Sequence, residues 1–472
     1  MLAIWSRLSQ KQQADNLKMT PQQQSQVTNE ILQGNLVKLT FKLSIPSTLG
    51  ILIFSLNNFL DGFLAGQFIG ETALAGITLA LPLTGIAEGF SLLVGVGSGS
   101  VLSQAIGSGN IKTQSKIFGN LIVMGVAIAF VITILGYSFG EKLIVFMGGS
   151  GEVASAGAAY FKTYILGSVF YMLAGASSQL IKSEGNIRLS TIFDLIFVIV
   201  NIFLNYIFIS VFHWGIQGIA LATVIGMAVS TIVNLTYFLS GKSSIPVNLK
   251  KLAIAIDLLP AILSVGVSSL FYPVMILVQE FVMFNLISDY GKDIDIAFFG
   301  ATMKLSSLMV IPIMGFAQAL QPVIGMNYGA NKYRRVKNAY LIFTLIGTTL
   351  LLFIWLPLQI APKIFLNIIL PDVNFTIKDV INFRIINMLI PIWPLAYCGN
   401  TFFLSIGKPK VVLLAIFLKS IVLNVPMMIF FSKIIALRGI YIGSILADFI
   451  FMVVVFLLTV KEFGHLSSLK CI

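Results

Sequence analysis

The sequence predicts an all-α integral membrane protein with twelve transmembrane helices, arranged as two parallel six-helix lobes that repeat one plan. Composition is the first observation: 10% of the 472 residues are charged, 57% are hydrophobic and the mean hydropathy is +0.96. Soluble domains carry roughly 25% charged residues. The second observation is a series of apolar stretches long enough to span a bilayer, and the third is a set of turn-like motifs that occurs twice.

The repeat is visible where short polar motifs interrupt long apolar runs. Gly107 in the motif QAIGSGN corresponds to Gly329 in MNYGANK, an offset of 222 residues (329 − 107). Gly185 in KSEGN and Gly407 in SIGKP keep the same offset (407 − 185). Two membrane-embedded copies of one bundle are typical of a transporter whose path lies between the halves.

Twelve apolar stretches are expected to be helices, because backbone polar groups in lipid must be satisfied within the segment. The expected spans are 42–65, 73–105, 117–139, 160–181, 189–212, 216–239, 258–287, 296–325, 339–360, 383–405, 411–432 and 439–460. The second and eighth exceed the length of a straight span, so tilt or kinks are expected there. The expected organisation is a polar tail (1–40), an N-lobe (41–239), a linker (240–257), a C-lobe (258–460) and a second tail (461–472).

The placement of lysine and arginine predicts the orientation. With the N-terminus inside, 20 of them lie on the inner side and 8 on the outer side, which is the bias expected of a cytoplasmic face. Both tails and the linker are therefore expected in the cytoplasm, and the tail 1–40 lacks the apolar core of a signal peptide. Because topology accounts for the net charge of +12, no nucleic-acid partner is expected.

Motifs for enzymatic chemistry are incomplete. The segment Leu239–Ser243 (LSGKS) ends like a phosphate-binding loop, but Thr236 stands where that motif needs glycine. His213 and His465 are the only histidines, so neither a His-based structural metal site nor a catalytic triad is expected. The sequence predicts no enzyme and no cofactor.

Ionisable residues inside the spans are the candidate functional residues, because a charge at the bilayer centre costs about 2.5–3.5 kcal/mol on insertion scales. Asp61 is the clearest of them, and Asn57 lies one turn before it on the same face of the first span. The alternative is that Asp61 lies in the outer headgroup layer, although Gly66 and Glu71 mark that boundary a turn or more later.

Three more polar residues are expected at the depth of Asp61 in the outer half of the N-lobe. Asn201 and Asn205 share one face of the fifth span, and Thr223 follows in the sixth. Their oxygens are the groups that a proton relay or a hard cation such as sodium requires. Asp194, two turns before Asn201 on the cytoplasmic side, is a further candidate for ion coupling. Separate hydrogen bonds between helices are the alternative.

Gln279 and Glu280 in the seventh span are placed to face the space between the halves. With Asn57 and Asp61, they are the residues expected to line a substrate cavity. Two lysines lie within the spans against five acids, which favours cationic or neutral cargo.

Several segments resemble the multidrug and toxic compound extrusion (MATE) family, especially its bacterial multidrug branch. The matching segments are Pro46, Asp61–Gly66 (DGFLAG), Ala73–Gly76 (ALAG), Ser183–Asn186 (SEGN), Gly218–Thr223 (GIALAT) and Gly315–Val336 (GFAQALQPVIGMNYGANKYRRV). The last looks like that branch's second-half signature, and the resemblance covers roughly residues 40–460.

The resemblance implies a monomeric antiporter in the bacterial inner membrane that expels organic cations or amphipathic drugs in exchange for protons or sodium ions, and so contributes to antibiotic resistance. The family's coupling residues fall on Asp61, Asn201, Asn205 and Thr223, which would also form any sodium site. Asn205 departs from the carboxylate that the family usually has. Glu280 is near the acid that some members carry in the seventh span.

A flippase for lipid-linked or other cell-envelope precursors, from the same wider superfamily of two-lobe bundles, is the alternative. Such a protein handles anionic pyrophosphate headgroups and should line its cavity with several Arg or Lys. The two lysines within the spans, Lys304 and Lys419, favour the exporter.

Overall fold

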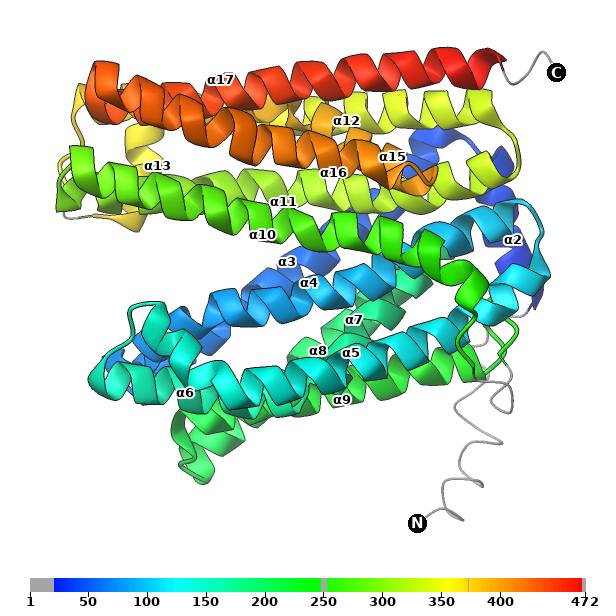
Figure 1. Ribbon diagram of the computed structural model, residues 1–472, viewed down its shortest axis with the longest axis horizontal. Helices are drawn as coiled ribbons and strands as arrows, with labels where there is room; N and C mark the ends of the chain where they lie inside the picture. Colours follow the sequence, from blue (N-terminus) through cyan, green and yellow to red (C-terminus); the bar gives the residue numbers. More distant parts are fainter. Residues whose placement is uncertain (1–20, 248–252, 372, 469–472) are drawn as a thin grey trace.

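The structure is a computed structural model that describes residues 21–247, 253–371 and 373–468, and every regular element in that part of the chain is helical. Ten helices there are long and apolar enough to cross a membrane, and a bent helix pair forms an eleventh span. One stretch of 60 residues contains two spans, because Ile435 and Ala436 leave the helical conformation and the chain reverses direction there (Figure 1). The expected all-α membrane fold, with six spans in each half, is confirmed.

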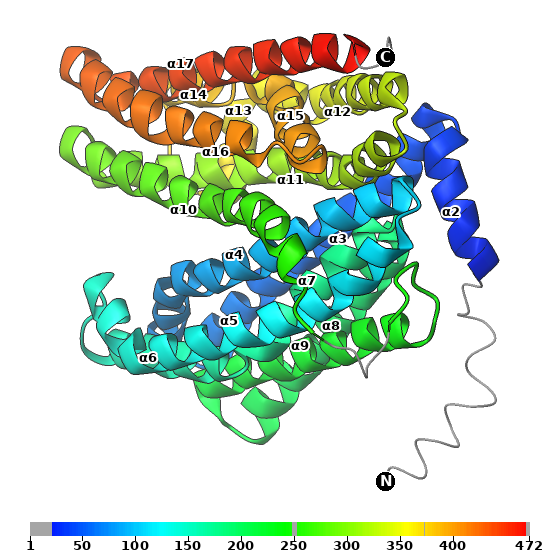
Figure 2. The same cartoon turned by 45° about the vertical axis from the view of Figure 1, so that its right-hand side comes forward.

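The two halves of the chain form two lobes that touch at one end and diverge toward the other (Figures 1 and 2). The N-lobe contains α3 (Leu36–Phe68), α4 (Glu71–Gly107), α5 (Ile111–Phe146), α6 (Gly151–Leu166), α7 (Ser168–Ser183), α8 (Ile187–Tyr206) with the π-helix η1 (Ile207–Val211), and α9 (Gly215–Leu239). The C-lobe contains η3 (Ile256–Leu258), α10 (Leu259–Tyr290), α11 (Asp293–Gly329), α12 (Tyr333–Ile360), α13 (Pro362–Ile369), α14 (Ile377–Ile386), η4 (Ile390–Ile392), α15 (Trp393–Ser405), α16 (Pro409–Phe417) with the π-helix η5 (Leu418–Asn424), and α17 (Val425–Ser468). Helices α6 and α7, which meet at 61°, are the bent pair.

The end where the lobes touch is called the closed end, and the opposite one the open end. A short helix, α2 (Pro21–Gln33), lies at the closed end and falls within the stretch expected to be a tail. Parts of the expected tails and linker, residues 1–20, 248–252 and 469–472, lie outside the described residues.

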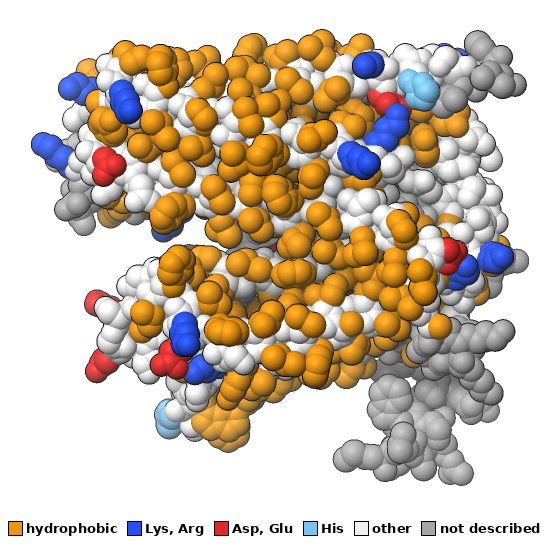
Figure 3. Space-filling model, viewed as in Figure 1, with side chains coloured by type: hydrophobic (Ala, Val, Ile, Leu, Met, Phe, Trp, Pro, Cys, Tyr) orange, Lys and Arg blue, Asp and Glu red, His pale blue; other side chains and the backbone are white. Residues whose placement is uncertain are grey.

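Hydrophobic side chains cover the middle of the molecule, and most charged side chains gather toward its two ends (Figure 3). Large apolar residues such as Phe130, Leu345 and Phe353 are 66%, 68% and 71% exposed. A soluble protein rarely exposes so continuous an apolar surface, whereas lipid is a suitable solvent for it. The same view shows the surface hollowed between the lobes at the open end.

The motifs that occur twice in the sequence are turns that end helices at the closed end. Gly109 and Asn331 both have left-handed backbones, with φ of +68° and +57°. Gly185 and Gly407 have φ of +85° and +76°. A left-handed residue just after a helix lets the following N–H groups bond to the last free carbonyls, and glycine or asparagine adopts it at least cost. The sequence repeat is therefore a repeat of helix-ending turns.

Glycines let the lobes approach backbone to backbone at the closed end. A Cβ atom on Gly107 of α4 would lie 2.0 Å from the carbonyl oxygen of Met326 in α11. A Cβ on Gly329 would lie 2.1 Å from the carbonyl oxygen of Gln104. The Gln104 side chain also donates to the carbonyl of Ser405, at 2.7 Å. No side chain fits at either glycine while the lobes are in contact.

Helix α2 contacts both lobes at the closed end. Its Ile31 is 1% exposed and lies against Gly185, in the turn between α7 and α8 of the N-lobe. From the C-lobe, the Arg335 guanidinium donates to the carbonyl of Ile31 through Nε and Nη2, at 3.1 and 3.0 Å, and to the carbonyl of Gly34 at 2.5 Å. Lys332 donates to the carbonyl of Leu32 at 3.1 Å. These bonds satisfy carbonyls that the last turn of a helix otherwise leaves free.

We expect Arg335→Ala to release α2 from the C-lobe. Hydrogen bonds to a charged group are worth about 1.5–3 kcal/mol, so amides 28–33 should exchange with deuterium about tenfold faster or more. Hydrogen-exchange mass spectrometry of the protein in nanodiscs measures this. The control is Arg334→Ala, since Arg334 is exposed beside it. Equal protection in both variants would mean that the guanidinium does not hold α2.

Candidate functional site

Five polar side chains from three helices meet inside the N-lobe, near its open end. Asp61 of α3 is 4% exposed, and its Oδ1 accepts from Nδ2 of Asn205 in α8 at 2.6 Å. Its Oδ2 accepts from the hydroxyl of Thr223 in α9 at 3.3 Å and from Nδ2 of Asn57 at 3.4 Å. The amide of Asn201, one turn before Asn205, lies 3.0 Å from the hydroxyl of Thr223. The structure thus brings together the residues that sequence reasoning placed at one depth.

The local sequence explains this arrangement. Asn57 and Asp61 are one turn apart on α3, and Asn201 and Asn205 are one turn apart on α8, so each pair presents one polar face. Backbone hydrogen bonding changes two residues after Asn205, where the π-helix η1 begins at Ile207.

The cluster contains a hydrogen-bond acceptor that its own members do not use. Oδ1 of Asn205 is buried and accepts no hydrogen bond from the described residues. With the Asn201 oxygen accepting from the Thr223 hydroxyl, Nδ2 of Asn201 donates to Asn57 at 2.9 Å and to Asp61 at 3.1 Å. Such a set can reorganise around a proton on Asp61, or turn several oxygens toward a cation, without moving the helices.

Asp194, a candidate from the sequence, is not part of this cluster. Its Oδ2 lies 3.4 Å from Nζ of Lys182 in α7, and its Oδ1 accepts from the hydroxyl of Ser178 at 3.2 Å. The sequence places Asp194 two turns before Asn201 on α8, toward the closed end, but it does not identify the side chains that contact Asp194. The structure gives Asp194 the positive partner that Asp61 lacks in the described part of the chain.

The four residues expected to line one substrate cavity belong to different places. Asn57 and Asp61 are in the N-lobe cluster, whereas Gln279 of α10 lines a pocket inside the C-lobe. Glu280 is exposed on α10 and does not line that pocket. Neighbouring residues on a helix point about 100° apart, so Gln279 faces the pocket while Glu280 points away from it.

A central cavity of about 230 Å³ lies between the lobes toward the closed end. Its apolar lining comes from Leu92 and Val96 of α4, Met314 of α11 and Leu404 of α15. Three glutamines, Gln179, Gln318 and Gln321, supply amide groups, and Lys182 contributes a charge that Asp194 balances. A mostly apolar cavity with a few amides suits organic molecules of varied shape.

Sequence reasoning missed an ion pair inside the C-lobe. Lys419 of η5 lies 2.9 Å from Asp448 of α17, and their side chains are 21% and 12% exposed. The signal was available, because both residues lie at similar distances from the outer turn that joins the last two spans.

Comparisons with known proteins agree with this architecture. A family model described as MatE matches residues 46–207 and 260–430, that is, both lobes. The multidrug export protein MepA of Staphylococcus aureus (strain bovine RF122 / ET3-1) is 23% identical over 297 residues, or 63% of this chain and 66% of the relative. The MepA of Staphylococcus saprophyticus is 24% identical over 307 residues, with 65% and 67% covered. The match thus spans just under two thirds of the length of the Staphylococcus aureus relative.

Solved structures share the fold along nearly the whole chain. A crystal structure of MATE in the bent conformation has a TM-score of 0.89 at 21% identity, covering 94% of this chain and 99% of the other. An outward-facing conformation of a multidrug resistance MATE family transporter of the MOP superfamily has a TM-score of 0.85 at 21% identity, with 93% and 98% covered. With a family model that matches both lobes, the chain belongs to the MATE family, whose members are membrane transporters and not enzymes.

Proposed function

We propose that this chain is a secondary active exporter that exchanges amphipathic, often cationic, organic compounds for protons or sodium ions by alternating access. It acts as a monomer in the bacterial inner membrane, with both termini in the cytoplasm. The observation that carries the proposal is the Asp61 cluster: a buried carboxylate that has no positive partner in the described part of the chain and is surrounded by amides and a hydroxyl.

The lobe arrangement supports alternating access. The lobes are sealed at the closed end by glycine contacts and a shared apolar core, and they diverge at the open end. Since the lysine and arginine bias assigns the closed end to the cytoplasm, this arrangement is the outward-facing one. The central cavity opens to the other side when the closed end separates.

The single carboxylate of the cluster favours the proton as the coupling ion. Asn205, Thr223 and Asn57 each donate a hydrogen bond to Asp61, so their hydrogens, and not their oxygens, face the carboxylate. Sodium binding instead requires the amides to turn their oxygens inward, with one carboxylate contributing all of the negative charge. Asn205 in place of an acid therefore favours a proton over tight sodium binding.

The charges near the central cavity favour cationic or neutral cargo over anionic lipid precursors. Lys182 and Lys419 are both neutralised by neighbouring carboxylates, and Lys304 is exposed on α11. A cavity for pyrophosphate headgroups needs several unpaired Arg or Lys side chains.

Efflux from proteoliposomes under separately imposed gradients tests the proposal. We expect a fluorescent cationic dye to leave when an inward proton gradient is imposed, and a sodium gradient alone to drive little transport. Efflux driven by sodium alone would change the coupling ion. Strong export of a multiply anionic lipid-linked compound without export of the dye would support the flippase instead.

The orientation makes a separate prediction. In a background with Cys398 and Cys471 replaced by serine, a membrane-impermeant maleimide should label Glu152→Cys in intact cells and should label Lys112→Cys only after permeabilisation. Both positions are exposed, Glu152 at the open end and Lys112 at the closed end. Labelling of the Lys112 position in intact cells would reverse the orientation.

A further inference from the structure

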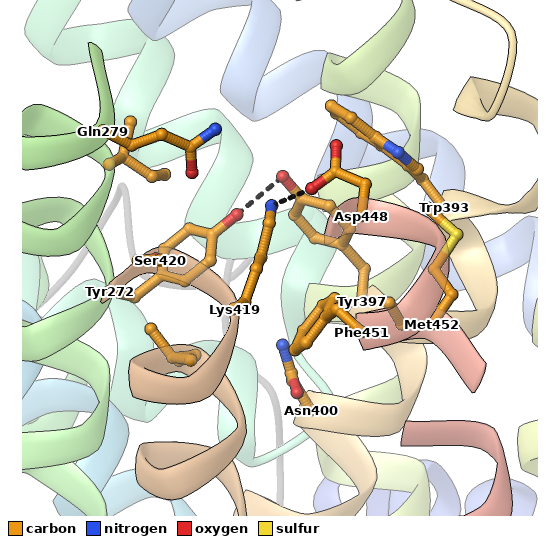
Figure 4. A pocket seen from close by; sticks show the side chains of 13 residues that line it. Tyr272, Gln279, Trp393, Tyr397, Asn400, Lys419, Ser420, Asp448, Phe451 and Met452 are labelled. Atoms are coloured by element: carbon orange, nitrogen blue, oxygen red, sulfur yellow. Dashed lines mark hydrogen bonds and ion pairs between the residues drawn. The ribbon is translucent and has the colours of Figure 1, made fainter. Parts of the chain in front are cut away.

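We infer that the C-lobe pocket around Asp448 is a binding site for the quaternary ammonium headgroup of an amphipathic cation, and that Lys419 occupies it as an internal competitor. The inference rests on the proposed export function for its cargo class, and it assigns that cargo a place in the lobe opposite Asp61. Figure 4 shows the pocket, with Lys419 and Asp448 at its centre.

Aromatic rings surround the cation in this pocket. Nζ of Lys419 lies 5.4 Å from the ring centroid of Phe451 and 5.8 Å from that of Trp393. The ring of Tyr397 stacks on Trp393 with centroids 6.2 Å apart. Faces of Trp, Tyr and Phe attract a cation, and cages of such rings are how proteins recognise quaternary ammonium groups. The lysine ammonium therefore marks where a foreign ammonium is stabilised.

The Asp448 carboxylate is poorly satisfied for a buried group. In the described part of the chain its one ion pair is with Lys419, and no hydrogen bond from another group reaches it. Buried Glu184, by contrast, accepts hydrogen bonds from Tyr237, Ser243 and Ser244. A purely structural buried carboxylate needs such additional donors to offset its desolvation. Asp448 retains acceptor capacity for a ligand.

The pocket adjoins the central cavity, which places it to receive the head of a longer molecule. Tyr272, Tyr397, Asn400 and Ile416 line both spaces. The pocket has about 30 Å³ free with Lys419 in place, and the central cavity about 230 Å³. An ammonium head that displaces the lysine can thus leave its apolar tail in the larger cavity.

Competition gives the two members of the ion pair opposite roles. The Asp448 carboxylate attracts any cation. The Lys419 ammonium is attached to the protein next to that carboxylate, so it competes with the ligand for the same site. Removing the lysine should strengthen binding of a foreign cation, and removing the acid should weaken it. A structural ion pair behaves differently, since loss of either partner leaves a buried charge unpaired and disturbs the same fold.

Equilibrium binding of radiolabelled hexyltrimethylammonium to the full-length protein in nanodiscs tests this. We expect Lys419→Met to tighten binding about tenfold or more and Asp448→Asn to weaken it about tenfold or more, which is the scale of one cation–π or charge contact removed from water. Lys419→Arg keeps a cation in the cage and should bind as the parent does. Lys304→Met, a span lysine outside both cavities, is the matched control.

The directions of the two shifts decide the inference. Weaker or unchanged binding in Lys419→Met overturns the inference. If Asp448→Asn is not inserted into the membrane, the binding measured for Lys419→Met is sufficient to decide. Parallel losses in both variants indicate a structural ion pair and overturn it as well. Gradient-driven efflux by the parent is measured alongside, so an absence of efflux together with opposite binding shifts refutes the proposed function and leaves the site assigned.

Discussion

Asp61→Asn is expected to abolish gradient-driven efflux while leaving folding and membrane insertion intact. Asparagine keeps the shape of the side chain and can hydrogen-bond to Asn57, Asn205 and Thr223, but it neither binds a proton nor carries a charge at neutral pH. Protonation can then no longer shift the equilibrium between two packing arrangements of α3, so the proton gradient is no longer coupled to transport. Removing a buried charge also removes its desolvation cost, so thermal stability should not fall.

Two further variants test whether the effect is specific to the carboxylate of Asp61. Asp61→Glu keeps the ionisable group and should retain partial transport, whereas Asp194→Asn should reduce transport less than Asp61→Asn because Asp194 is paired with Lys182 outside the cluster. Dye efflux from proteoliposomes under a proton gradient is the measurement. If Asp61→Asn pumps at the parental rate while Asp194→Asn is inactive, the coupling site has been assigned to the wrong carboxylate.

Gly107→Ala and Gly329→Ala are expected to shift the protein away from the conformation in which the lobes touch at the closed end, and to reduce efflux severely. Each added Cβ would lie about 2 Å from a backbone oxygen of the opposite lobe. Overpacking costs about 1–3 kcal/mol, so a rigid backbone contact should change the population by about tenfold or more. Spin labels at exposed Lys112 and Arg334, one in each lobe, should report a longer distance between the closed-end loops.

Matched glycines in the same helices control for helix propensity. A Cβ at Gly85 of α4 or at Gly300 of α11 meets no atom within 4 Å, so both alanine variants should transport as the parent does. Unchanged label distances in all four variants would show that the lobes adjust at the closed end without separating.

The N-lobe cluster could be predicted because its geometry follows from helix arithmetic. Asn57 and Asp61, like Asn201 and Asn205, are four residues apart and share a face, and consecutive spans reverse direction in lipid. The position of each residue along its span then places all four side chains at a similar depth in the membrane. Rotation of a helix about its axis is harder to predict, so the sequence does not show that Gln279 and Glu280 point in different directions.

The rest depends on contacts that one sequence does not encode locally. Pairing of Lys419 with Asp448 requires the rotation of η5 against α17, and a π-turn changes the direction of the side chains that follow it. Docking of α2 depends on Arg335, some 300 residues away, bonding to backbone carbonyls that have no sequence signature. A polar segment before the first span therefore resembled an unattached tail.

Asparagine at position 205 has an electrical consequence for the proposed exchange. It leaves one ionisable side chain in the N-lobe cluster, so the proposed exchange would hand over one proton in each cycle. Exchange of one proton for one monovalent cation moves no net charge across the membrane. The membrane potential therefore does not drive this exchange. One pH unit corresponds to 1.36 kcal/mol, so each unit sustains about a tenfold cargo gradient. A dication would carry one charge outward against an inside-negative potential, at about 2.3 kcal/mol per 100 mV.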